Sequence, residues 1–212
     1  HYGLHCDANR RASFVIEVRC PLDNAADYGA LGYLVGKKIG AAVPLFRGIS
    51  GKVDNDCLKI LGAAMAASGA VALYHIEGLT PEARRHNMLA EHYQRIVIED
   101  LEAAYHSLNA PIEQIDLVTL GCPHASLQDI AATAALVAGK KLAIPLWITT
   151  ASPIYEAARR AGYLATIEQA GGRIVSDTCV IVAPIAELGV RSLATNSAKA
   201  ACYAPSHCQA QV

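Results

Sequence analysis

Residues 116–126 read DLVTLGCPHAS and contain one complete unit of the predicted fold. The first five letters form a β-branched, apolar run that is typical of a strand. The Gly-Cys-Pro-His turn that follows leads to Ser126, a residue type that caps helix N-termini. Beyond it, apolar side chains recur at helical spacing at Ile130, Ala134 and Val137. The segment is therefore predicted to form a strand, a loop and a helix in succession.

The same alternation extends in both directions along the chain. Short β-branched or apolar runs predict strands at 12–19, 43–46, 71–76, 146–149, 173–176 and 180–183. Helical patterns and caps predict helices at 28–39, 54–67, 80–108, 153–161, 166–170 and from 197 to 203. Strands separated by helices imply right-handed βα units, so the fold class expected is α/β, with mostly parallel sheets and flanking helices. A boundary near 109–111 is expected to separate a first α/β region, 1–110, from a second, 111–212.

The composition narrows the class of protein. Hydrophobic residues make up 53% of the 212 residues and charged residues 17%, which excludes intrinsic disorder. The net charge is −1 and no stretch concentrates lysine and arginine, so neither nucleic acid nor a membrane surface is expected as a partner. Seven cysteines without a CxxC pair are typical of reduced thiols, and no signal peptide is visible. A cytoplasmic protein that acts on a small molecule is expected.

Three loops carry the polar and sulfur side chains that chemistry needs. They are 121–126 (GCPHAS), 177–179 (DTC) and 194–199 (ATNSAK), and each is expected to follow an apolar strand. In open α/β sheets, ligands gather at the carboxyl ends of strands. Cys122 precedes a helix N-terminus, whose dipole favours the thiolate. Cys179 has an equivalent place, so the two thiols could meet at one metal, although a small buried residue is the alternative for each.

Each neighbouring polar residue also has a structural alternative. His124 is either an acid or a capping residue, and Ser126 is either a reactive hydroxyl or the helix cap. Asn196 and Ser197, with Lys199, resemble an anion pocket, but the same residues also suit an ordinary helix start.

Two histidines in the first half complete the candidates. His5 lies in a polar cluster before the first strand, where loops are often simple turns. His75 ends an apolar strand, where a hydrogen-bonded core histidine is the alternative to substrate binding. The sequence has no GxGxxG, P-loop, HExxH or GxSxG motif, which makes nucleotide hydrolysis, dehydrogenation and serine hydrolysis poor candidates.

Taken together, the motifs resemble the aconitase X family, a branch of the aconitase superfamily of hydro-lyases. The resemblance is carried by YGLH at 2–5, NRRA at 9–12, SGAVA at 68–72, His75, GLTPEA at 78–83, GCPHAS at 121–126, DTC at 177–179 and ATNSAK at 194–199. It implies aconitase-like α/β domains from the central to C-terminal part of the large catalytic portion. An N-terminal segment and a swivelling small domain or subunit would then lie outside this sequence.

The resemblance also implies a dehydratase that removes water from a small hydroxy acid with iron as the Lewis acid. The family's iron–sulfur cluster, or mononuclear iron in some members, is bound by three cysteines. By motif, Cys122 and Cys179 are two of these ligands. The third is not placed, and Cys6, Cys202 and Cys208 are its weaker candidates within this sequence.

By the same resemblance, the remaining motif residues belong to the active site. Thr178, Asn196, Ser197 and Lys199 would line the substrate site, and His124 and Ser126 would lie near the cluster. The expected catalytic residues are His124, Ser126 and Lys199. The expected substrate-binding residues are His5, His75, Thr178, Asn196 and Ser197.

Two substrates are known in the family: cis-3-hydroxy-L-proline in bacterial members and mevalonate 5-phosphate in archaeal ones. Because a phosphate pocket should cluster more lysine and arginine than this sequence does, cis-3-hydroxy-L-proline dehydratase is favoured over mevalonate 5-phosphate dehydratase. Two other classes stay open: a non-catalytic metabolite-binding or subunit module, and a thiol enzyme that uses Cys122 as nucleophile with His124.

Overall fold

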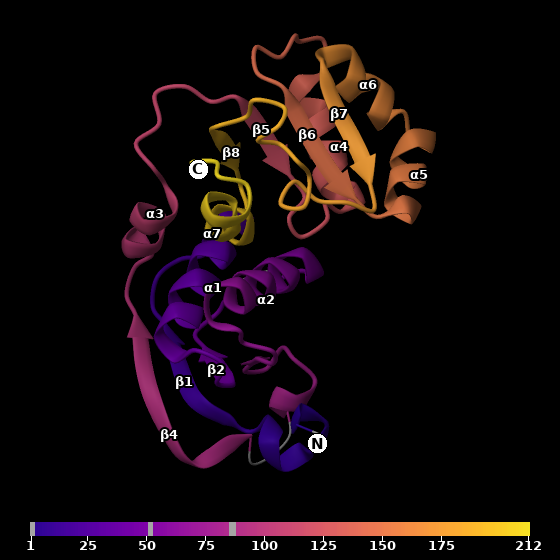
Figure 1. Ribbon diagram of the computed structural model, residues 1–212. Helices are drawn as coiled ribbons and strands as arrows, with labels where there is room; N and C mark the ends of the chain where they lie inside the picture. The colour runs from indigo at the N-terminus through magenta and orange to yellow at the C-terminus, as the bar shows by residue number, and fades with distance from the viewer. Residues whose placement is uncertain (1–2, 51–52, 85–87) are drawn as a thin grey trace. The chain divides into compact units, whose positions relative to one another are not determined.

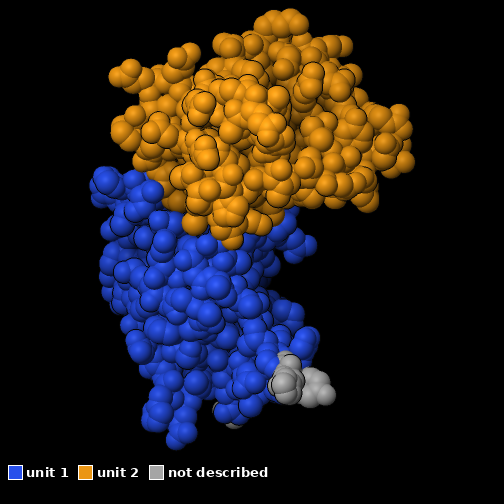
Figure 2. All heavy atoms as spheres, in the orientation of Figure 1, with its two compact units in different colours: residues 1–107 blue, residues 108–212 orange. Residues whose placement is uncertain are grey.

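Two parallel sheets organise the chain, as Figure 1 shows for the computed structural model. The structure describes residues 3–50, 53–84 and 88–212. The chain divides into two compact units, residues 1–107 and residues 108–212, which are coloured separately in Figure 2. Each unit contains a sheet of four parallel strands with flanking helices. The protein is therefore an α/β protein, as the alternation of strands and helices predicted.

Unit 1 has the strand order β3-β2-β1-β4. Its elements are β1 (Ala12–Val18), α1 (Ala25–Ile39), β2 (Pro44–Arg47), α2 (Asn55–Gly69), β3 (His75–Ile76), β4 (Leu89–Ile98) and α3 (Glu102–Leu108), with 3-10 turns at Gly3–His5, Asp7–Arg10 and Glu82–Arg84. Helices α1 and α2 pack against each other, and their contact is very close at Gly36, where an added Cβ would overlap Ser68 and the backbone of Met65. Gly36, a glycine within the helix predicted at 28–39, thus serves helix packing. The core of the unit contains Ile16, Leu31, Phe46, Leu61 and Met65.

The prediction of one continuous helix over 80–108 is wrong. Thr80 and Pro81 lead only into the 3-10 turn, residues 85–87 lie outside the described residues, and the strand β4 and the short helix α3 follow. Strand β4 is an edge strand that pairs with β1 in parallel, with Ile96 beside Ile16. Most of its side chains are exposed, so it lacks the alternation that marks a half-buried strand, and it is rich in helix-forming residue types. Strand pairing overrides that local preference.

Unit 2 has the strand order β7-β6-β5-β8. Its elements are β5 (Leu117–Leu120), α4 (Leu127–Val137), β6 (Leu146–Thr150), α5 (Ser152–Arg160), α6 (Tyr163–Ala170), β7 (Gly172–Ser176), β8 (Leu193–Thr195) and α7 (Ala198–His207). Helix α4 packs against α5 and α6, and its buried residues are Ile130, Ala134 and Val137, as predicted. A second apolar cluster joins Leu117 and Leu193 to Ala204 of α7.

Two predicted strands also differ from the structure. Residues 180–183 form turns, in which Val182 N donates to Cys179 O at 3.2 Å. Their apolar character has another cause, because Val180 and Ile185 are buried in the cluster with Leu117. The strand predicted at 71–76 is only the two residues of β3. A short buried apolar run does not by itself distinguish a strand from a packed turn.

No helix within residues 3–50, 53–84 and 88–212 has both the length and the apolar character that crossing a membrane requires.

Candidate metal centre in unit 2

Cys122 and Cys179 follow the carboxyl ends of β5 and β7. These strands are parallel members of one sheet, so both loops lie at the same edge. Cys122 is 5% exposed and Cys179 is half-buried. Cys179 lies near enough to Cys122 to help raise the pKa of the Cys122 thiol. The structure thus brings together the two sulfurs that the sequence singled out.

The environment of Cys122 favours its neutral thiol. Burial, followed by the nearby Cys179, raises the pKa of Cys122 to about 11, while the positive charge of Lys199 acts in the opposite direction. A thiol with a raised pKa is a poor nucleophile near neutral pH, which argues against the thiol-enzyme interpretation. A soft metal cation, by contrast, binds by displacing the thiol proton.

Strand β6 lies between β5 and β7, and its last residues contact both cysteine loops. The hydroxyl of Thr149 donates to Gly121 O at 2.7 Å, and that of Thr150 donates to Ala125 O at 2.7 Å. The backbone N–H of Ala125 donates to Thr149 O at 2.9 Å. The loop that contains Cys122 is therefore bound to the end of the middle strand by three hydrogen bonds.

Asp177 fixes the start of the Cys179 loop. Its backbone N–H donates to Thr150 O at 2.9 Å. Its carboxylate accepts hydrogen bonds from the backbone N–H of Ser152, at 2.9 Å, and from the Ser152 hydroxyl. These two bonds are the main reason why the pKa of Asp177 lies below its ordinary value. The residue has φ +55°, a left-handed conformation that aspartate tolerates better than most residue types.

His124 connects the two cysteine loops directly. Its Nε2 lies 2.8 Å from the carbonyl oxygen of Thr178. A carbonyl oxygen only accepts, so Nε2 is the donor in this bond. Thr178 itself is half-buried. The structure therefore gives His124 a positioning contact beside Cys179.

Ser126 caps helix α4. Its hydroxyl oxygen accepts from Asp129 N at 3.1 Å, and the Asp129 carboxylate accepts from Ser126 N at 2.9 Å. This reciprocal pair is a capping box. The structure thus shows Ser126 as the helix cap, which was the structural alternative to a reactive hydroxyl.

The third polar loop lies beside the first, because β8 is the neighbour of β5. The buried hydroxyl of Ser197 donates to Cys122 O and accepts from Ala200 N at 3.0 Å, so Ser197 caps α7 and holds the Cys122 backbone. Lys199 is half-buried and Asn196 is exposed. Of these three, Lys199 supplies the positive charge that acts on Cys122.

The two histidines predicted for substrate binding belong to unit 1. His5 is exposed in a 3-10 turn. His75 is 1% exposed, and its Nε2 lies 2.8 Å from the carbonyl oxygen of Arg10. The Arg10 guanidinium in turn binds the Glu82 carboxylate through Nε and Nη2 at 2.7–3.1 Å. His75 thus has the hydrogen bond expected of a core histidine.

No third ligand joins the two thiols within residues 3–50, 53–84 and 88–212, where no group of three metal-binding side chains occurs. Cys6 is exposed in unit 1, and Cys202 is half-buried on α7. Cys208 is buried, with its sulfur 3.5 Å from Ile181 O and 3.8 Å from Val180 O. The described residues therefore bring no third metal-binding side chain to Cys122 and Cys179.

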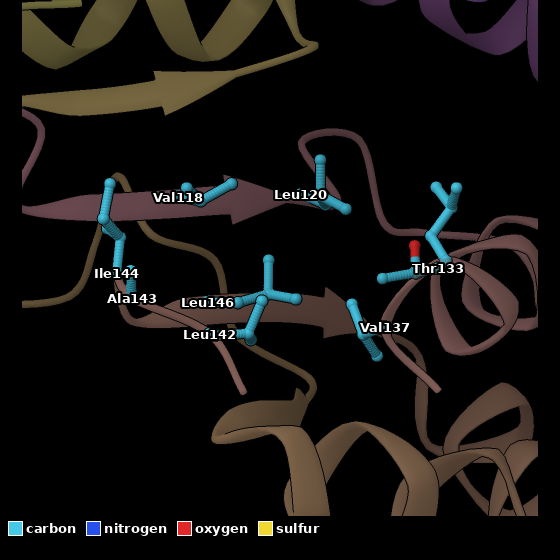
Figure 3. Close-up of a pocket in the computed structure, with 9 residues that line it drawn as sticks. Val118, Leu120, Thr133, Val137, Leu142, Ala143, Ile144 and Leu146 are labelled. Carbon is cyan, nitrogen blue, oxygen red and sulfur yellow. The ribbon is translucent and has the colours of Figure 1, made fainter. Parts of the chain in front are cut away.

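A separate pocket in unit 2 is apolar. This cavity has a volume of about 390 Å³. Figure 3 shows its lining residues on and around β5, β6 and the end of α4. Its lining residues are Val118, Leu120, Thr133, Leu136, Val137, Leu142, Ala143, Ile144 and Leu146. Thr133 is the one polar side chain in this set, and its hydroxyl already donates to Asp129 O at 2.8 Å. The pocket therefore offers no partner for a carboxylate or a phosphate.

Thr149, Thr150 and Ser152 are the residues that the sequence analysis missed. The signal that could have found them is the TTAS run at the end of the strand predicted at 146–149. Its position at the carboxyl end of a strand is the same as that of the cysteine loops. Without the strand order, nothing showed that this strand lies between the other two.

Comparisons with known proteins identify relatives that match both units of the chain. The family models described as the aconitase X second domain and third domain match residues 12–106 and 115–212. The phosphomevalonate dehydratase large subunits of Methanothermobacter thermautotrophicus and Methanocaldococcus jannaschii are 46% and 44% identical, over 98% and 100% of this chain and 52% and 55% of their own lengths. The cis-3-hydroxy-L-proline dehydratase of Pseudomonas aeruginosa is 38% identical over 96% of this chain and 37% of its own length.

A solved structure shares the fold. The crystal structure of Thermococcus kodakaraensis aconitase X (holo-form) superposes with a TM-score of 0.89 at 41% identity, and the match covers 97% of this chain and 53% of that one. The chain thus spans about half the length of the large subunits it matches. With two domain models matching in order and the fold in agreement, the chain belongs to the aconitase X family.

Proposed function

We propose that the chain is part of a dehydratase that removes water from a small hydroxy acid. The observation that carries this proposal is the meeting of Cys122 and Cys179 beside Lys199 at one edge of the unit 2 sheet. The relatives are named as dehydratases, which supports the same reaction class. Since the chain spans about half of those large subunits, the activity is proposed for the full-length protein.

The two thiols fit an iron centre by their chemistry. Thiolates are the ligands of iron–sulfur clusters. The same burial that keeps the Cys122 thiol protonated when no metal is bound would shield a bound metal from water. Cys122 and Cys179 would hold the iron, and a further ligand would come from outside the described residues. An iron site with an open position would supply a Lewis acid for the loss of hydroxide, which is a poor leaving group.

The chain's own polar residues suit the substrate's carboxylate. Lys199 is half-buried next to Cys122, so its charge is available for an anion and stabilises negative charge that develops during proton removal. Asn196 and Thr178 lie in the flanking loops and provide amide and hydroxyl groups for orientation. We assign Ser197 and His124 to holding the loop backbones, because their contacts are with Cys122 O and Thr178 O.

The relatives favour phosphomevalonate as the substrate, since the two named large subunits are 44% and 46% identical to the chain and the hydroxyproline enzyme is 38% identical. The weak clustering of basic residues in the sequence favours cis-3-hydroxy-L-proline instead. We propose phosphomevalonate as the first candidate and cis-3-hydroxy-L-proline as the second. Because the first group of relatives are named large subunits, a small subunit is the proposed partner.

The test is turnover of both compounds by the full-length protein, prepared without oxygen and mixed with its small subunit. Formation of the dehydrated product is followed by NMR. We expect one of the two compounds to be dehydrated, and the Cys122→Ser variant to lose the activity. An iron-loaded protein that binds either compound without dehydrating it would support the non-catalytic alternative instead.

A further inference from the structure

The loops that carry Cys122 and Cys179 are not neighbours in the sheet. They follow β5 and β7, and the strand β6 lies between these two. Apart from the direct contact between His124 and Thr178 O, the separation of the two sulfurs therefore depends on what lies at the end of β6. That place is occupied by residues 149–152 (TTAS).

On one side, this segment holds the Cys122 loop through buried groups. Thr149 is 2% exposed and Thr150 is 0% exposed. Their hydroxyls donate to Gly121 O and Ala125 O, both at 2.7 Å, so the carbonyl groups on either side of Cys122 are fixed. Because buried hydroxyls and carbonyls that lose a partner cost free energy, these contacts resist rearrangement.

On the other side, the segment holds the Cys179 loop. Thr150 O accepts from Asp177 N at 2.9 Å, and the Asp177 carboxylate accepts from both the backbone N–H and the hydroxyl of Ser152. Thr150 thus contacts both loops, with its hydroxyl on the side of Ala125 and its carbonyl on the side of Asp177. Asp177 is two residues from Cys179, so little chain separates the anchor from the sulfur.

We propose that residues 149–152 form a positioning bridge that sets the separation of Cys122 and Cys179 and so the affinity of the site for iron. The inference rests on the proposed function for the identity of the metal. Thr149, Thr150, Ser152 and Asp177 are positioning residues in this proposal, because they act on the sulfurs only through the loop backbones. Groups that orient metal ligands typically change metal affinity by about 10–100-fold when they are removed.

The experiment compares matched variants of the full-length protein, prepared without oxygen. Thr150→Val keeps the shape of the side chain but removes its donor, whereas Thr150→Ser keeps the donor. Ser152→Ala removes the hydroxyl that binds Asp177. Thr133→Val is the control, because it removes a threonine hydroxyl that donates to a carbonyl within α4 of the same unit. Iron affinity is measured by competition with a chelator, and circular dichroism verifies the fold.

We expect Thr150→Val and Ser152→Ala to bind iron about 10–100-fold more weakly than the wild type, and Thr150→Ser and Thr133→Val to stay close to it. Because Ser152 is only half-buried, Ser152→Ala is expected to fold. It therefore still tests the proposal if Thr150→Val does not fold. Folded Thr150→Val or Ser152→Ala protein with wild-type iron affinity overturns the bridge but leaves the proposed function standing. A wild-type protein that binds no iron overturns both.

Discussion

The imidazole Nε2 of His124 and the carbonyl oxygen of Thr178 are 2.8 Å apart, so a side chain of one cysteine loop holds the backbone of the other. The residues are 54 positions apart in the sequence. The contact lies one residue before Cys179, and it spans the end of the strand that separates the two loops. His124, which its motif suggests as a catalytic residue, therefore connects the two loops that carry Cys122 and Cys179.

Substitution of His124 separates this positioning role from acid catalysis. His124→Gln keeps an N–H donor at a similar reach, whereas His124→Ala removes it. We expect the alanine variant to bind iron about 10–100-fold more weakly and the glutamine variant to remain near wild type, as measured by chelator competition. If His124 serves only as an acid, both variants retain iron and both lose turnover.

Replacement of Ser126 should affect folding. Ser126→Ala removes the oxygen that accepts from Asp129 N, and a lost N-cap typically costs about 1 kcal/mol of stability. The free energy of unfolding of the variant, measured in urea, should fall by this amount, and its turnover should be retained. Ser107→Ala is a suitable control, because that exposed hydroxyl donates back to Ala103 O within α3 and caps no helix. Unchanged stability together with lost turnover would instead assign a catalytic role to Ser126.

Gly121 is the glycine of unit 2 that we expect to tolerate alanine least. It has φ +97°, and an added Cβ would overlap the backbone of Thr149. Gly139 also has a positive φ, +71°, but an added Cβ meets nothing within 4 Å. The conformational cost alone is about 1–2 kcal/mol, so Gly139→Ala should lose that much. Gly121→Ala should lose at least about 1 kcal/mol more, because the backbone must also move.

Urea unfolding of the metal-free protein measures the free energy that each of Gly121→Ala and Gly139→Ala loses relative to the wild type. Equal losses for the two variants would contradict the close approach of the Cys122 loop to β6.

Asp116 makes part of the stability of unit 2 depend on pH. Its carboxylate accepts from the backbone N–H groups of Arg191 and Ser192, which lower its pKa below the ordinary 3.8. The folded state therefore binds a proton more weakly than the unfolded state does. The resulting stabilisation is complete above the unfolded pKa and is lost as the pH falls through the lower pKa of the folded state. The effect is modest, because solvent screens the group.

Asp116→Asn should therefore lower the urea midpoint at neutral pH and make it fall less steeply between about pH 5 and about pH 2. Glu187→Gln, which removes an exposed carboxylate from the same unit, serves as the control. A fall as steep in Asp116→Asn as in wild type would show that another group carries the pH dependence.

The elements with strong local signals could be predicted from the sequence. Helix α4 was predicted because its cap, Ser126, and its buried stripe are adjacent in the chain. Strand β4 could not be predicted, because its stability comes from pairing with β1 and its own exposed side chains carry helix-forming tendencies. The apolar run at 180–183 resembles a strand in sequence, but it forms turns in which Val180 is buried.

In the candidate site, too, features with a local sequence signal could be predicted and features set by long-range pairing could not. That Cys122 and Cys179 lie at one edge of the sheet could be predicted from their places after strand ends. Thr150 and Ser152 could not, since their importance comes from the strand order, which puts β6 between the two cysteine loops. That order is set by long-range pairing and leaves no local mark in the sequence.

The most direct test of the central claim is the iron content of the full-length protein purified without oxygen. It is measured for the wild type, Cys122→Ser, Cys179→Ser and the control Cys57→Ser, which changes a half-buried cysteine of unit 1. We predict bound iron in the wild type and in Cys57→Ser, and its loss in both other variants. Iron retained in full by Cys122→Ser or Cys179→Ser, or a wild type without iron, would contradict a shared metal site at these two sulfurs.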